Sequence, residues 1–191
     1  MDKEVENIER VIETEWEASE GLQAFEMVKY GIKVSLEGER KEISRAWGFK
    51  NGKGEIMISP IYSCVWKFQD GISKVCKNGK WGVIDKCGKV VVPIIYQTIY
   101  QTSDGMLQVQ LLDKWGCLKK DGTTIVEPQY DYIFPFRGAF AGIKDGKKYG
   151  FIHLSGKVVI KPCFDEIGQI SVDGTVKVHD GTMWKKIVLL D

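Results

Sequence analysis

The stretch KNGKWGVIDKCGKVVVP, residues 77–93, decides the fold class of this 191-residue chain. Trp81 stands directly before Gly82, a second glycine follows at Gly88, and a β-branched run ends at Pro93. Each glycine inside a helix costs about 1 kcal/mol, whereas short β-branched runs that end at proline are typical of strands. The stretch therefore predicts two short strands joined by a glycine turn.

The same arrangement recurs along the chain at a constant spacing, with its aromatic residue at positions 47, 81, 115 and 149. Its shared positions are an aromatic–glycine pair, a second glycine seven residues after the aromatic residue, and another ring fifteen residues after it. The members are Trp47-Gly48, Trp81-Gly82, Trp115-Gly116 and Tyr149-Gly150, then Gly54, Gly88, Gly122 and Gly156, then Tyr62, Tyr96, Tyr130 and Phe164. So many positions in one register indicate a tandem repeat.

Each repeat predicts a β-meander of three strands. The first strand carries the aromatic–glycine pair, the second is the β-branched run, and the third follows an Asp-Gly turn, as in DGISKV at 70–75. Alternate residues of a strand share a face, so Trp81 and Val83 are expected together, with Gly82 facing the other way. There the missing side chain admits a neighbouring strand or ring, or a bulge. We favour close approach, with the ring fifteen residues on as the partner.

The repeat also resembles a known family. The aromatic–glycine pair, the Gly-Lys turn and the run to proline and Tyr/Phe-Asp (PQYD at 128–131, PCFD at 162–165) resemble the bacterial WG repeats, also called KWG repeats. The resemblance covers residues 47 to about 186, with Tyr149 in place of tryptophan and Ser63 in place of aspartate. It implies a β-repeat scaffold and supplies no catalytic residues.

The expected organisation is all-β with a short helix at the start. Val5, Ile8, Ile12 and Trp16 follow at steps of three and four, which predicts an amphipathic helix over residues 2–17 that caps the first repeat or binds a partner. We expect an open twisted array, with a closed propeller-like ring as the alternative. The expected segments are an acidic helical segment at 1–20, a degenerate β capping unit at 21–46, and a repeat region at 47–191, comprising repeats at 47–80, 81–114, 115–148 and 149–182 and a partial C-terminal capping strand.

Composition and charge favour a soluble protein of the cytoplasm. The net charge is +1, yet residues 1–20 hold eight acidic and two basic groups, so an acidic head precedes a mildly basic body. No apolar run approaches the roughly 18 residues that span a bilayer, and the acidic N-terminus is unlike a signal peptide. The five cysteines form no CxxC pair, so free thiols are expected, with no disulfide framework and no zinc site.

The sequence predicts no catalytic residue, no cofactor and no metal. His153 and His179 occupy positions where other repeats hold unrelated residues, which favours surface positions over a site. A Cys87–His153 nucleophilic pair requires the fold to join them. Asp131 and Asp165 occupy the same position in successive repeats, so turn capping is favoured over paired acid–base chemistry.

Two repeated positions are candidates for partner binding. The first position holds an aromatic ring in three repeats, at Trp66, Tyr100 and Phe134. The second holds a lysine directly before each later aromatic–glycine pair, at Lys80, Lys114 and Lys148. The rings are either partner anchors or core, and the lysines either guard a strand edge, meet an acidic protein or contact nucleic acid.

The leading hypothesis is a non-enzymatic scaffold that binds another protein, for which the lysines suit an acidic partner. The first alternative is an enzyme or nucleotide-binding protein with a site between the acidic N-terminal segment and the array, lined by Glu13, Glu17 or Glu20 with a histidine. The second is nucleic-acid binding through the lysine ladder. The oligomeric state is not predicted.

Overall fold

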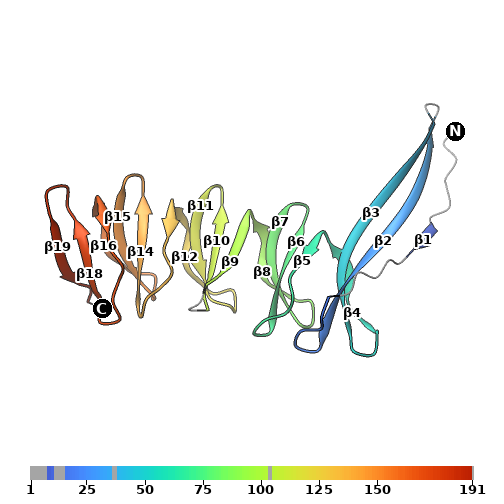
Figure 1. The fold of residues 1–191 in the computed structure, drawn as a ribbon, viewed down its shortest axis with the longest axis horizontal. Helices are drawn as coiled ribbons and strands as arrows, with labels where there is room; N and C mark the ends of the chain where they lie inside the picture. Colours follow the sequence, from blue (N-terminus) through green and yellow to red (C-terminus); the bar gives the residue numbers. More distant parts are fainter. Residues whose placement is uncertain (1–7, 11–15, 36–37, 103–104, 191) are drawn as a thin grey trace. The chain divides into compact units, whose positions relative to one another are not determined.

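The computed structural model describes residues 8–10, 16–35, 38–102 and 105–190, and every regular element in them is a β-strand (Figure 1). The chain divides into two compact units, Met1–Ile95 (unit 1) and Tyr96–Asp191 (unit 2). All-β architecture is therefore confirmed for the described residues. Among these residues the structure contains no helix of the length and hydropathy needed to cross a membrane.

The strands form five small antiparallel sheets, and none of these described sheets closes on itself. Sheet 1 and sheet 2 belong to unit 1, and sheets 3 to 5 belong to unit 2, with β8 ending at the boundary. Sheet 1 contains β1 (Ile8–Arg10), β2 (Leu22–Ser35), β3 (Gly38–Asn51) and β4 (Ile56–Tyr62); sheet 2 contains β5 (Cys64–Val65), β6 (Ile72–Lys77), β7 (Lys80–Asp85) and β8 (Val90–Tyr96); sheet 3 contains β9 (Thr98–Gln101), β10 (Leu107–Leu111), β11 (Lys114–Leu118) and β12 (Thr124–Tyr130); sheet 4 contains β13 (Tyr132–Ile133), β14 (Phe140–Asp145), β15 (Lys148–His153) and β16 (Val158–Phe164); sheet 5 contains β17 (Glu166–Ile167), β18 (Thr175–His179) and β19 (Trp184–Val188).

The sheets are out of phase with the sequence repeats. Sheets 2, 3 and 4 each begin midway between two aromatic–glycine pairs, and sheet 5 begins at the same position of the last repeat. Each of these sheets therefore combines the end of one repeat with the start of the next. The chain bends between consecutive sheets at Ser63, Gln97, Asp131 and Asp165.

The three strands expected for each repeat are all present, but each complete sheet has a fourth, short strand at its start. Sequence reasoning missed the short strands β5, β9 and β13 because two to four residues are too few for a period-2 pattern.

The helix expected over residues 2–17 is not supported. Within that range Ile8–Arg10 form β1, which pairs with β2 through Ile8 opposite Tyr30 and Arg10 opposite Val28. Residues 1–7 and 11–15 lie outside the described residues. Steps of three and four in the sequence were outweighed by the hydrogen bonds that β2, an extended strand, offers along its edge. The segment 21–46, expected as a capping unit, contributes β2 and most of β3.

A β-bulge of unusual size explains the aromatic–glycine pair. In sheet 3, Trp115 lies opposite Tyr130 and Cys117 lies opposite Val126, so one residue of β11, Gly116, faces three of β12. The extra residues arch over the glycine. The ring fifteen residues on, here Tyr130, therefore lies opposite the tryptophan and not over the glycine as expected.

The arch leaves no space for a side chain on the glycine. A Cβ atom on Gly116 would lie 2.7 Å from both the Pro128 nitrogen and the Val126 carbonyl oxygen. Proline suits this arch because its nitrogen has no hydrogen to donate to the ladder. Close approach is thus confirmed, and the approaching group is backbone. The corresponding shortest distances to backbone atoms are 2.5 Å at Gly48, 2.8 Å at Gly82 and 2.4 Å at Gly150. At Gly82 the Ile94 Cγ1 atom would also lie 2.5 Å away.

The second glycine of each repeat forms the predicted turn. At Gly88 the φ angle is +79°, a left-handed conformation that glycine adopts without steric cost. The Gly88 N–H donates to the Asp85 carbonyl over 3.0 Å, and the Asp85 carboxylate accepts from the Cys87 and Lys89 amides. The turn therefore positions β8 against β7.

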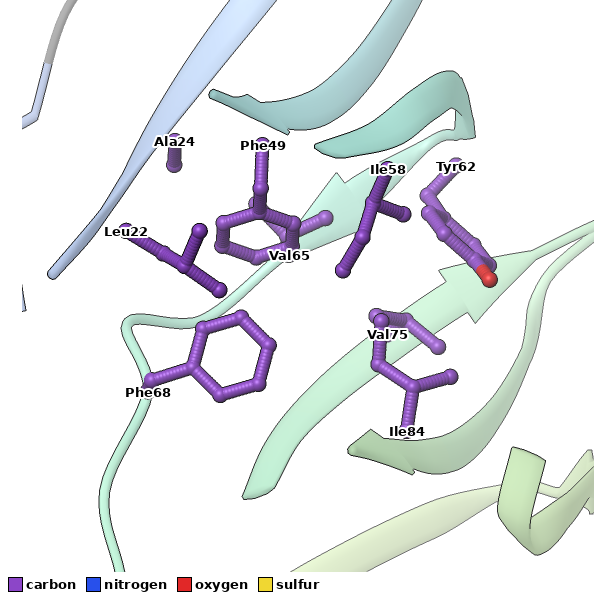
Figure 2. Close-up of a cluster of buried hydrophobic side chains, with 9 residues drawn as sticks. All are labelled: Leu22, Ala24, Phe49, Ile58, Tyr62, Val65, Phe68, Val75 and Ile84. Carbon is purple, nitrogen blue, oxygen red and sulfur yellow. The ribbon is translucent and has the colours of Figure 1, made fainter. Parts of the chain in front are cut away.

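Sheets 1 and 2 enclose the core of unit 1 (Figure 2). Phe49 of β3 lies two residues after Trp47, as predicted for the inward face, and is 1% exposed. Its ring meets the edge of Phe68 at a centroid distance of 4.8 Å. Burial of each ring contributes about 2–3 kcal/mol. The other members are Leu22, Ala24, Ile58, Tyr62, Val65, Val75 and Ile84.

In unit 2, sheet 4 is covered on both faces. Ile152 of β15 packs toward sheet 3 in a cluster with Ile133 and Val126, whereas the adjacent Phe151 packs toward sheet 5 with Val176. Both Phe151 and Ile152 are buried because consecutive strand residues point to opposite faces. Stacking of sheets therefore provides the core that a single small sheet lacks.

Candidate functional site

Four of the six tryptophans line one open cavity in unit 1. We call it the tryptophan cavity; it has a volume of about 440 Å³. Its lining residues are Trp16, Trp47, Cys64, Val65, Trp66, Lys67 and Trp81. Such a volume lies within the range of about 300–1,000 Å³ that is usual for ligand pockets.

The repeat places three of these tryptophans. Trp47 on β3 and Trp81 on β7 are the aromatic members of consecutive aromatic–glycine pairs, and Trp66 directly follows β5. Trp16 joins them from outside the repeats, with its ring 5.3 Å from that of Trp47. Trp16 donates its backbone N–H to the Ala24 carbonyl over 3.3 Å. The cavity thus depends on the segment that precedes the first repeat.

Trp66 is the most exposed ring of the cavity, at 52%. The Lys74 ammonium lies over this ring, 4.2 Å from its centroid, and Trp66 donates its backbone N–H to the Lys74 carbonyl over 2.9 Å. Partial burial lowers the pKa of Lys74. A cation over one indole face orients the ring and leaves a flat face for a ligand.

Unit 2 carries a continuous aromatic row in the corresponding positions. Tyr100 stacks on Trp115 with centroids 5.8 Å apart and planes at 19°. Trp115 meets Tyr132, Tyr132 meets Phe134, and Phe134 meets Tyr149, at centroid distances of 5.8, 4.9 and 6.2 Å. Of the three predicted anchors, Tyr100 is 55% exposed, and Phe134 is half-buried within this row.

A second cavity, of about 320 Å³, interrupts the ring column in unit 2. Gly168 stands where the other repeats carry Trp66, Tyr100 and Phe134, and it lines this cavity together with Arg137. The cavity therefore lies where the fourth repeat, with Gly168, lacks the aromatic side chain of the other repeats.

The lysine column is already paired in unit 2. Lys114 Nζ donates to Asp131 over 2.6 Å, and Lys148 Nζ donates to Asp165 over 2.7 Å. The Asp131 hydrogen bond raises the pKa of Lys114, and the Lys114 ammonium lowers the pKa of Asp131. Lys80, the third member, is exposed on β7, and its repeat has Gln97 where the two later repeats have Asp131 and Asp165. The paired lysines of unit 2 therefore stabilise the bends between sheets.

Asp131 also caps a turn. Its second carboxylate oxygen accepts the Gly146 N–H over 2.6 Å. The turn-capping role favoured for this position is thus present in the structure. His153 and His179 accept turn amides in the same way, from Ser155 and Gly181.

The structure does not assemble a metal site in the part it describes: no three His, Cys, Asp or Glu side chains lie close enough together to hold an ion. Glu20, one of the acidic residues of the enzyme alternative, pairs with Lys86 at 3.0 Å and accepts the Gly71 N–H. These two contacts lower the pKa of Glu20, with the Lys86 hydrogen bond the larger cause. Glu13 lies outside the described residues.

Sequence reasoning identified Trp66 but missed the cavity around it. The sequence predicts packing positions for Trp47 and Trp81 and a helical position for Trp16, so it does not predict their convergence. The signal available was the concentration of tryptophan between residues 16 and 81.

Comparison with known proteins agrees with the repeat. A family model described as WG containing repeat matches residues 47–81, 81–115, 115–149 and 149–178. No curated protein matches the chain significantly. Since the four matches span more than half of the 191 residues, the chain belongs to the WG containing repeat family.

Proposed function

We propose that this protein is a non-enzymatic binding module of the bacterial cytoplasm, and that its tryptophan cavity binds an extended, acidic segment of another protein. The observation that carries the proposal is the convergence of Trp16, Trp47, Trp66 and Trp81 on one open cavity. Tryptophan is enriched among the residues that dominate binding energy at protein interfaces.

The lining favours a peptide over a small polar substrate. Indole rings provide large apolar faces at low conformational cost, and aromatic grooves are a recurrent site for extended polyproline-type segments. Lys67 is the charged residue of the lining. A polar substrate requires several convergent donors and acceptors, which four tryptophans, a valine and a cysteine supply poorly.

The charge beside the cavity favours an acidic segment. Lys67 lines it, and Lys74 lies over the Trp66 ring. Carboxylates flanking the bound segment would gain attraction from both ammonium groups, an effect that salt weakens. Lys114 and Lys148, in contrast, are paired with aspartates, which argues against the lysine ladder as a nucleic-acid surface.

A synthetic peptide of alternating proline and glutamate residues tests the proposal by titration of tryptophan fluorescence. We expect saturable binding that weakens with salt, and a roughly 30-fold loss in Trp66→Ala, because truncating an interface anchor costs about 2 kcal/mol or more.

Trp184→Ala is the matched control. The exposed fraction of Trp184, 51%, is similar to the 52% of Trp66, but Trp184 lies on β19 in unit 2. Both variants retain five tryptophans. Equal affinities of the two variants, or no saturation with the unmodified protein, would contradict the proposal.

A further inference from the structure

Two cysteines face each other beside the tryptophan cavity. Cys64 on β5 lies directly opposite Cys76 on β6, and Cys76 lies directly opposite Trp81 on β7. Residues opposite one another on neighbouring strands share a face of the sheet. Cys64, Cys76 and Trp81 therefore form one row across sheet 2, and Cys64 and Trp81 line the cavity.

The spacing of this pair suits a disulfide. The Cα atoms of directly opposed antiparallel residues are about 4.5–5.5 Å apart, and disulfides join Cα atoms about 4.4–6.8 Å apart. Both thiols are free, with Cys64 exposed and Cys76 only 7% exposed. An oxidant can thus reach the Cys64 thiol, and the Cys76 thiol lies next to Cys64 on the neighbouring strand.

The other cysteines lack this arrangement. Cys117 lies opposite Gln108 and Val126, Cys87 lies in the turn after β7, and Cys163 lies among the extra residues of β16 opposite Gly150. In the other sheets, the positions of the Cys64–Cys76 pair are occupied by Thr98 with Gln110, Tyr132 with Lys144, and Glu166 with His179. The thiol pair is thus specific to the sheet that carries Trp66 and Trp81.

We propose that Cys64 and Cys76 form a reversible cross-strand disulfide when a peroxide oxidises the protein. The Cys64 thiolate attacks one peroxide oxygen, the O–O bond breaks, and Cys64 becomes a sulfenic acid. The hydroxide or alkoxide that leaves takes up a proton and departs as water or an alcohol. The Cys76 thiolate then attacks the Cys64 sulfur, the S–S bond forms, and hydroxide leaves. The two thiols lose two electrons in total, which the peroxide accepts, and a dithiol reductant reverses the reaction.

The disulfide changes the tryptophan cavity. Bond formation draws the sulfurs to about 2 Å, so the Cys64 side chain, which lines the cavity, must turn toward Cys76. Trp66 lies two residues after Cys64, on the same face, and its ring contacts Lys74 two residues before Cys76. We therefore expect oxidation to reorient Trp66 and weaken peptide binding. This second step rests on the proposed function, whereas the disulfide does not.

Peptide mapping of the full chain tests the disulfide directly. In a Cys87→Ser/Cys163→Ser variant, hydrogen peroxide should consume two of the three remaining thiols, and tryptic peptides 54–67 and 75–77 should be recovered as one disulfide-linked species. In Cys64→Ser, a substitution at an exposed position, Cys76 should stay a free thiol. Oxidation of Cys64 to sulfinic acid with Cys76 still free would overturn the proposal.

A separate titration tests the consequence for binding. The proline–glutamate peptide is titrated into reduced and oxidised protein, and oxidation should weaken binding in the parent but not in Cys64→Ser. A linked pair with unchanged affinity would overturn the effect on the cavity and leave the disulfide established. Absence of peptide binding by reduced protein would instead count against the proposed function, since the mapping uses no peptide.

Discussion

Replacing Gly48 by alanine tests the close approach that the aromatic–glycine pair makes possible. A Cβ atom there would lie 2.5 Å from the Ile58 carbonyl oxygen and 2.8 Å from the Pro60 nitrogen, both in backbone. Contacts of 3.0–3.4 Å are the shortest that such atoms tolerate, so the arch of β4 must retreat by about 0.5–0.9 Å. The displaced residues cover Phe49, which is 1% exposed in the core.

The cost follows from three opposing effects. Over-packing of a tight interior costs about 1–3 kcal/mol, and a weakened ladder hydrogen bond costs about 1 kcal/mol more. Alanine in place of glycine restricts the unfolded chain and returns about 0.4–1 kcal/mol. The net loss of unfolding free energy is therefore about 2 kcal/mol, which lowers Tm by roughly 4–8 °C in a chain of this size.

Gly52→Ala is the matched control in the same unit. Nothing lies within 4 Å of a Cβ atom at Gly52, and its φ is not among the positive ones. We expect this variant to be neutral or up to about 1 kcal/mol more stable. Urea unfolding gives the free energies, and amide exchange should show faster opening of β3 and β4 in Gly48→Ala alone. Unfolding free energies that agree for the two variants within the error of the measurement would refute the reasoning.

Two further predictions concern contacts between sheets of unit 2. Gln108 is buried and donates its side-chain amide to the Ile133 carbonyl over 2.7 Å. Gln108→Leu should therefore lower the free energy of unfolding in urea by about 1–3 kcal/mol. An unchanged urea midpoint would contradict this prediction. Asp131 has a pKa lowered by Lys114 and the Gly146 N–H, so its stabilising effect is complete above its unfolded pKa, near 4, and is lost as the pH falls through its lower folded value. Asp131→Asn should thus have a lower Tm at pH 7 and a smaller decrease in Tm between pH 5 and pH 2; parallel pH profiles for the two proteins would contradict the pairing.

Much of the local structure could be predicted because it depends on neighbours in the chain. The constant spacing of the repeats, the strand that holds Trp81, and the left-handed turn at Gly88 follow from short-range propensity and glycine geometry. The burial of Phe49 follows from strand alternation.

The N-terminal prediction failed for a physical reason. A step of three and four residues is a weak preference, and in the described residues 8–10 the open edge of β2 provides backbone hydrogen bonds that no local pattern reveals. The candidate site was only partly predictable for a similar reason. Trp66 was a candidate by its position in the repeat, but Trp16 and Trp47 come within 5.3 Å of each other only through folding of unit 1.

The sequence by itself determined the family, the repeat and the strand-forming segments, because each repeat contains its own turns and alternating faces. Only the tertiary structure decided that sheets 2, 3 and 4 each span two repeats, that backbone fills the space above Gly116, and that Lys114 pairs with Asp131. It likewise brought four tryptophans to one cavity and set Cys64 opposite Cys76. These features depend on pairing register and on stacking between sheets, which join residues that the local pattern does not connect.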